Sequence, residues 1–185
     1  MSIYCLSPDV DNVMFFTIDD NDVYKKMENF DIEGFGAPLK FSWVAPNAKF
    51  IASDSGSKVL PDISQWNGVD LILSDKAKRV LDDVLKDNGE YYPLAGGCKG
   101  YWFYNPTQKL GNSVINLEKT TSHYFDDGSW ERIASLVFNA LDETSLSAVF
   151  SLEIDRGVNL YCSDLFKDII EKNGLVGINF SIVSK

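Results

Sequence analysis

Histidine and cysteine are scarce in this 185-residue sequence. The only histidine is His123, and the three cysteines, Cys5, Cys98 and Cys162, are far apart in the chain. A zinc site of the usual type needs four such ligands at close spacing, so none is predicted. An odd number of scattered cysteines also argues against a disulfide framework and favours a reducing compartment. We therefore expect no metal, no cofactor and no disulfide.

Long apolar runs are missing as well. No stretch approaches the roughly 20 apolar residues that span a membrane. The first residues, Met1–Leu6, contain no basic segment, apolar core or cleavage site of a secretory signal. The sequence therefore predicts a cytoplasmic protein that does not work at a membrane.

Positive charge is the third shortage. The chain has 17 Lys and Arg against 27 Asp and Glu, for a net charge of −10. Because phosphate contacts need Lys and Arg, nucleic acid is a disfavoured partner. A basic protein would be attracted by this field, although acidity also serves solubility alone. The acids gather in segments 1–40 and 118–143, and the predicted partner contacts are Asp19, Asp20, Asp22, Glu28, Asp31, Glu33, Asp126, Asp127 and Glu131.

Apolar residues, by contrast, are plentiful. They make up 45% of the chain and include 12 Phe, eight Tyr and four Trp. A chain of this length buries roughly 70% of its unfolded surface, so it can build a core without covalent help. We expect a single domain over 1–185, with a possible N-terminal subregion at 1–56 and a repeat-containing body at 57–185.

The repeat consists of two similar units. Residues 69–78 and 158–167 share one pattern, a short apolar run followed by Ser-Asp and, three residues later, Lys. In each copy the serine is placed to cap a helix, whose apolar residues recur at helical spacing. Asn88-Gly89 and Asn173-Gly174 then suit the helix ends. Each unit is therefore predicted to be strand, helix, strand.

Other segments add mostly strands. A third helix is predicted over 129–141, where Ser129 is the expected cap and Ile133, Leu136 and Val137 fall on one face. A short helix is also allowed within 20–30. Further strands are predicted at 3–6, 13–18, 39–44, 101–104, 113–117, 122–125 and 148–154. The predicted fold class is α+β, with a mixed, largely antiparallel sheet, about three helices and two similar strand–helix–strand units.

Catalytic signals are weak. Cys98 lies in Ala95-Gly96-Gly97-Cys98-Lys99-Gly100, where a nearby lysine favours a reactive thiolate, but the glycines are better explained as a turn between strands. His123 has no partner at catalytic spacing in the sequence. The run Asp19-Asp20-Asn21-Asp22 lacks the glycine and glutamate of an EF-hand. A small enzyme centred on Cys98 or His123 remains an alternative.

The aromatic run Tyr101-Trp102-Phe103-Tyr104 allows two interpretations. In a strand its side chains alternate between two faces, so at least one face is core. The second face is either another core, which we favour, or an exposed aromatic patch. Aromatic anchors ringed by acids are typical of a surface that binds a basic protein.

Several motifs resemble those of immunity protein family eleven of bacterial polymorphic toxin systems. They are Leu60-Pro61-Asp62, Leu73–Lys78, Tyr92-Pro93-Leu94, Val149–Leu152, Leu160–Lys167 and Gly174–Phe180, and the resemblance covers about residues 39–183. It implies a cytoplasmic protein that binds and blocks a cognate toxin from a contact-dependent, Rhs-type or type VI secretion system. The family has no catalytic residues to carry over, and residues 1–38 lie outside the resemblance.

The sequence therefore favours a protein that works by binding another protein and not by catalysis. The expected partner is a cognate toxin with a basic surface, such as a nuclease that must hold phosphates. A non-catalytic adaptor subunit is the second alternative. Neither the toxin's activity nor the oligomeric state follows from the sequence.

Overall fold

Strands outnumber helices in this protein, as the sequence predicts. The computed structural model describes residues 2–19, 21–22, 37–40, 42–127, 130–139 and 146–184, with the backbone alone for Trp130 and Glu131. The fold is mixed α+β, and its strand pairs are largely antiparallel. Within these ranges two α-helices are present instead of about three, and neither is long and apolar enough to cross a membrane.

The first predicted unit forms a four-stranded sheet covered by one helix. Its elements are β4 (Ile63–Trp66), β5 (Asp70–Ser74), α3 (Asp75–Leu85) and β6 (Gly89–Pro93), joined by β8 (Tyr101–Pro106). The strand order is β4-β5-β8-β6 and every neighbour is antiparallel. The strands before and after the helix are therefore parallel to each other and separated by β8, a split β-α-β arrangement.

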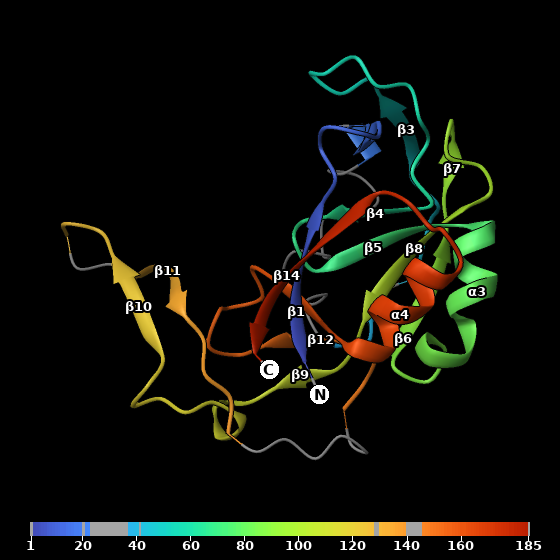
Figure 1. The fold of residues 1–185 in the computed structure, drawn as a ribbon. Coiled ribbons are helices and arrows are strands. Elements are labelled where there is room, and N and C mark those ends of the chain that lie inside the picture. Colours follow the sequence, from blue (N-terminus) through green and yellow to red (C-terminus); the bar gives the residue numbers. More distant parts are fainter. Residues whose placement is uncertain are drawn as a thin grey trace.

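The second unit repeats this plan with a different central strand. It contains β12 (Val149–Leu152), β13 (Leu160–Ser163), α4 (Asp164–Lys172) and β14 (Ile178–Ser184). The strand between β13 and β14 is β1 (Ile3–Pro8), which is antiparallel to both. The N-terminal strand thus takes the place that β8 holds in the first unit, and the N- and C-terminal ends of the chain lie close together (Figure 1).

Smaller elements complete the architecture. β2 (Phe15–Ile18), β3 (Asn47–Ile51) and the short β7 (Ala95–Gly96) form a separate sheet. β9 (Lys109–Leu110) extends the second unit's sheet by pairing in parallel with β12. Segment 1–56 is therefore divided between two sheets, because β1 belongs to one and β2 and β3 to the other.

A hairpin replaces the predicted helix at 129–141. β10 (Thr121–Tyr124) pairs with β11 (Trp130–Ser135), and the hairpin stands away from the body at the left of Figure 1. The prediction of a helix is wrong because spacing alone does not distinguish a helix from a strand when a partner strand is available. The Asp127-Gly128 pair between two aromatic-rich runs is a hairpin signal that outweighs Ser129 as a cap.

Two further predicted strands are also wrong. Residues 113–117 form the end of a 3-10 helix, η1 (Asn112–Val114), and a single bridge from Ile115 to Phe138. The described residues of 39–44 are not in a strand, because side-chain bonds and ring stacking hold this segment against β6. Most of the allowed helix at 20–30 lies outside the described residues.

The two helices share one core. Leu81 and Leu85 of α3 and Phe166 and Ile170 of α4 are buried in the same cluster, together with inward residues of both sheets. Each sheet has a second face, which points away from the helices. In the first sheet this face packs on β2 and β3, and in the second it packs on residues near β11. Because β5 is covered on both faces, its three central residues, Leu71 to Leu73, are all apolar and buried.

The two serine caps differ. Ser74 Oγ accepts a bond from Ala77 N at 3.1 Å, as an N-cap does, whereas Ser163 makes no such bond. At the start of α4, Asp164 instead accepts bonds from Ser2 N at 2.5 Å and Tyr4 Oη at 3.2 Å. These bonds, that of Ser2 first, hold the pKa of the Asp164 carboxyl below its usual value. Asp164, at the start of α4, thereby anchors the N-terminal strand β1.

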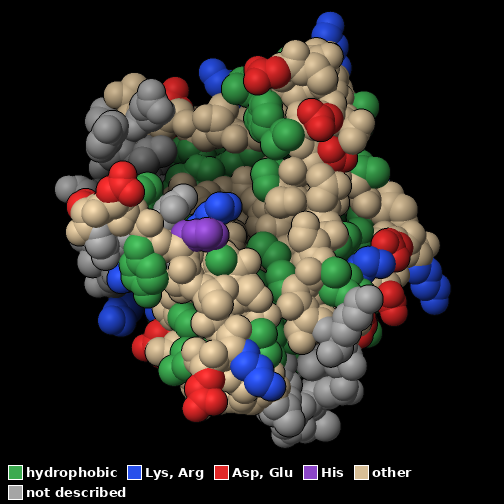
Figure 2. All heavy atoms as spheres, turned by 60° about the vertical axis from the view of Figure 1, so that its left-hand side comes forward, with side chains coloured by type: hydrophobic (Ala, Val, Ile, Leu, Met, Phe, Trp, Pro, Cys, Tyr) green, Lys and Arg blue, Asp and Glu red, His purple; other side chains and the backbone are tan. Residues whose placement is uncertain are grey.

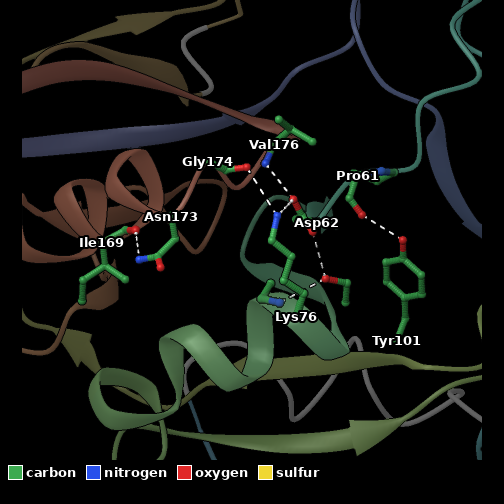
Figure 3. Close-up of polar contacts among 10 residues, drawn as sticks. Pro61, Asp62, Lys76, Tyr101, Ile169, Asn173, Gly174 and Val176 are labelled. Carbon is green, nitrogen blue, oxygen red and sulfur yellow. Dashed lines mark hydrogen bonds and ion pairs between the residues drawn. The ribbon is translucent and has the colours of Figure 1, made fainter.

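A polar joint connects the units where α3 begins and just after α4 ends (Figure 3). The Asp62 carboxylate accepts bonds from Lys76 Nζ at 3.0 Å, Ser74 Oγ at 3.3 Å and Val176 N at 3.2 Å. Lys76 Nζ also reaches Gly174 O at 3.5 Å. Residues from three of the motifs that carry the family resemblance therefore meet here, in a role that holds the fold together.

We predict that Gly177→Ala destabilises the protein more than Gly174→Ala. Both glycines have positive φ angles, 122° and 57°. A Cβ at Gly177 would collide with the carbonyl oxygen of Ile63 and lie 2.6 Å from Pro61 Cβ, whereas Gly174 has open space. We expect a loss of about 3 kcal/mol or more at Gly177 and about 1 kcal/mol at Gly174, measured by urea unfolding. Equal losses would contradict close packing at this joint.

Candidate functional site

The predicted N-terminal acids divide into one exposed residue and one buried residue. Asp19 is exposed at the end of β2, where it lines a shallow cavity of about 200 Å³ with Asn47 and Lys49. Asp22 is 8% exposed, and its carboxylate accepts a bond from Asn47 N at 2.5 Å. Burial and this bond fit a role in positioning the start of β3. Asp20, Glu28, Asp31 and Glu33 lie outside the described residues.

The second predicted group lies on the hairpin. Asp126 and Asp127 are exposed and follow β10 directly. The Glu131 backbone belongs to β11, but its side chain lies outside the described part of the structure. Figure 1 shows the hairpin and the β3 region at different ends of the molecule, so Asp19 and Asp22, which lie beside β3, do not share a surface with Asp126 and Asp127.

Exposed aromatic rings stand next to the hairpin acids. Tyr124 is 62% exposed and Phe125 is 56% exposed, and both directly precede Asp126. Leu117, just before β10, is exposed as well. Aromatic side chains are enriched at protein interfaces, and carboxylates beside them would attract a basic partner. We call Tyr124, Phe125, Asp126 and Asp127 the hairpin tip.

Tyr124 and Phe125 are not among the partner contacts predicted from the sequence. In the aromatic run 101–104, for which the sequence allows a second core or an exposed patch, Phe103 and Tyr104 are fully buried and Tyr101 and Trp102 are half-buried. The favoured interpretation of a second core is confirmed, because β8 contributes Tyr104 to the shared helix core and Phe103 to the core under β2 and β3. The sequence signal for the exposure of Tyr124 and Phe125 is that these two adjacent aromatic residues come just before Asp126-Asp127-Gly128, a run typical of an exposed turn.

A cleft of about 330 Å³ separates the hairpin stem from the second sheet. Arg132, Ile133 and Leu136 line one side, and Cys5, Val158, Asn159, Tyr161 and Val183 line the other. Figure 2 shows this side of the molecule, where hydrophobic side chains gather in and around a hollow. The cleft is mainly apolar and gives a ligand few polar groups to bind.

One buried carboxylate lies behind this cleft. Asp155 is fully buried and accepts bonds from Tyr161 Oη at 2.8 Å, Gly157 N at 3.0 Å and Asn159 Nδ2 at 3.3 Å. Burial raises the pKa of its carboxyl, and these bonds oppose the increase. Because three donors occupy the carboxylate, its role is to hold the loop between β12 and β13 in place.

The Cys98 thiol is in the wrong environment for a nucleophile. Its side chain is fully buried, and burial raises its pKa to about 12. An active thiol needs the opposite shift, toward thiolate at neutral pH. The glycine-rich segment around it is a turn from β7 to β8, in which Tyr101 N donates to Cys98 O at 2.9 Å. This arrangement supports the turn interpretation.

His123 lies on the exposed hairpin. It occupies β10 opposite Arg132 of β11, and its side chain is exposed. General base catalysis needs a positioned partner and shelter from water. Across the described ranges, no group of three His, Cys, Asp or Glu side chains converges in a way that would hold a metal ion.

Comparison of the chain with protein-family models and with curated proteins returns no match. The resemblance to the immunity family therefore rests on the motifs quoted above. The structure places several of them at the joint between the two units, where they stabilise the fold.

We predict that the three cysteines stay unmodified by iodoacetamide at about pH 8 while the protein is folded. Burial raises the pKa of Cys5 to about 11 and also raises that of Cys162, and Cys98 is shifted in the same direction. A raised pKa keeps each thiol neutral, so the reactive thiolate is scarce. Mass spectrometry should detect three labels only after unfolding in urea. Rapid labelling of native Cys98 would contradict this and favour the enzyme alternative.

Proposed function

We propose that this protein is a non-catalytic, cytoplasmic immunity protein that binds a cognate bacterial toxin and blocks it by protein–protein contact. The observation that carries the proposal is the hairpin tip, where Tyr124 and Phe125 are exposed beside Asp126 and Asp127. The family resemblance over residues 39–183 supplies the class of partner.

Charge supports a basic partner. The protein has a net charge of −10, and the tip carries two exposed carboxylates on a hairpin that stands away from the body in Figure 1. Electrostatic complementarity speeds diffusional encounter more than it strengthens the final complex. The aromatic rings contribute to the lifetime of the complex, because large apolar side chains that are buried on binding slow its dissociation. A basic nuclease toxin fits both features.

The proposal is tested first by co-purification. The protein encoded by the neighbouring gene, expressed as an inactive variant, should bind the tagged immunity protein in a pull-down. Co-expression with the active form should protect cells from its toxicity. Absence of both binding and protection would overturn the proposal.

We predict that Asp126→Lys with Asp127→Lys slows association with the toxin. The association rate should fall by about tenfold at low ionic strength and lose much of its salt dependence, because the steering field is reversed locally. Surface plasmon resonance at several salt concentrations measures both quantities.

The matched control for this charge reversal is Asp54→Lys with Asp87→Lys. Both residues are exposed and lie outside the hairpin, and the pair changes the net charge by the same amount. An equal slowing by the control would show that only the overall charge matters.

We predict that Tyr124→Ala with Phe125→Ala speeds dissociation of the complex. Removing two exposed anchors should weaken binding by about 2 kcal/mol or more, with little effect on the association rate. Unfolding stability should stay near that of the wild type, since neither ring is part of the core. Unchanged dissociation would place the contact elsewhere on the molecule.

A further inference from the structure

The hairpin leaves the body of the protein where two segments of the chain cross. The chain runs toward the hairpin through residues 113–120 and returns through residues 136–139, and Asn116 N donates to Val137 O at 2.8 Å between them. Beyond this crossing, β10 and β11 pair with each other and stand away from the body (Figure 1). The bonds at the crossing therefore lie where the direction of the hairpin is set.

Apolar side chains anchor both segments of the crossing to the second sheet. Ile115 is 3% exposed and Leu136 is 9% exposed, and both belong to the cluster that contains Phe150 and Tyr161. Phe138 packs against the same cluster and forms a backbone bridge with Ile115. The body side of the crossing is thus held by burial of apolar surface.

One hydroxyl connects the bases of the two hairpin strands. Thr120 immediately precedes β10, and Val137 lies two residues after the end of β11. Thr120 Oγ1 accepts a bond from Val137 N at 3.0 Å and donates to Val137 O at 3.4 Å. Thr120 N in turn donates to Asn116 O at 2.9 Å. A single side chain therefore joins the hairpin base to the crossing.

Asn139 makes a second set of bonds, on the body side of Thr120. Its Nδ2 donates to Ser113 O at 3.0 Å and to Ile115 O at 3.1 Å, and its backbone N donates to Val114 O at 2.9 Å. These bonds hold the two crossing segments together. Thr120, by contrast, acts at the point where the hairpin strands begin.

The direction of the hairpin also sets the shape of the cleft beside it. Arg132, Ile133 and Leu136 form the hairpin wall of this cleft, and Tyr161 and Val183 belong to the opposite wall. A rotation of the hairpin about its base would move one wall relative to the other and displace the hairpin tip. A partner that contacts both the tip and the cleft needs them in one arrangement, and a preorganised surface avoids the cost of ordering it on binding.

We infer that Thr120 is a positioning residue, whose hydroxyl holds the hairpin in one direction so that the tip and the cleft are preorganised for the partner. Its effect on binding rests on the proposed function, because the partner is the cognate toxin. Without the hydroxyl, Val137 N loses its acceptor and the hairpin samples several directions. Only the fraction of molecules in the competent direction then binds, and the apparent affinity falls by that fraction.

Distance measurements between two spin labels test the direction of the hairpin without the toxin. The labels are attached to Asp126→Cys on the tip and Asp168→Cys on α4, both exposed positions, and protein without these cysteines controls for labelling of native thiols. Thr120→Val, which lacks the hydroxyl, should broaden the distance distribution by about twofold or more. Thr120→Ser, which keeps the hydroxyl, should leave it narrow. An unchanged distribution in Thr120→Val would overturn the inference.

Binding kinetics with the inactive toxin separate positioning from direct contact. Thr120→Val should lower the association rate by about threefold to tenfold and leave the dissociation rate unchanged, since Tyr124 and Phe125 are intact. The salt dependence of association should also stay the same, because no charge is altered. Thr120→Ser should associate like the wild type. Equal slowing by both variants, or faster dissociation at an unchanged association rate, would contradict a positioning role.

Two further variants control for stability. Gly174→Ala is expected to lower stability without touching the hairpin, so it should bind like the wild type at a temperature where both are folded. Weakening equal to that of Thr120→Val would assign the effect to stability and overturn the inference. If Thr120→Val does not fold, Asn139→Ala replaces it, because it removes two bonds at the crossing and should broaden the distance distribution in the same way.

Failure of this inference is distinguishable from failure of the proposed function. If the wild type does not bind the neighbouring gene's product, the proposed function fails, and the distance measurements still decide whether Thr120 sets the hairpin direction. If the wild type binds and Thr120→Val broadens the distribution without slowing association, the role of Thr120 in binding fails and the proposed function stands.

Discussion

The packing of α3 and α4 into one shared core is the constraint on which the rest of this structure depends. Neither sheet buries its helix-facing side without the other unit, because Leu81 and Leu85 belong to the same cluster as Phe166 and Ile170. The Asp62 and Lys76 bonds then fix the loop after α4 against the loop before β4. The two units therefore share one hydrophobic core, and the hairpin of β10 and β11 stands outside it.

The place of β1 explains how one sequence yields two similar units. β8 follows its own unit in the chain, whereas the equivalent central strand of the second unit comes from the N-terminus. Asp164, at the start of α4, bonds Ser2 and Tyr4 and so fixes that strand. The second unit is therefore complete only when the N-terminal strand β1 pairs with β13 and β14 near the C-terminus.

Function is proposed from the parts that the core does not use. The hairpin tip carries exposed rings and carboxylates, and an apolar cleft lies between the hairpin stem and the second sheet. A single partner that engages both would combine electrostatic steering with burial of apolar surface. The buried Cys98 and the exposed His123 offer no comparable arrangement for chemistry.

The sequence by itself determined the acidity, the α+β class, both strand–helix–strand units and their helices, since apolar spacing and Gly ends are local signals. It also indicated the turn around Cys98. Tertiary structure alone decided that residues 130–135 are a strand, because pairing with β10 outweighed a helical spacing. It likewise decided that Asp22 is buried on Asn47 and that Tyr124 and Phe125 are exposed. These outcomes depend on contacts between residues far apart in the chain, which composition and spacing do not encode.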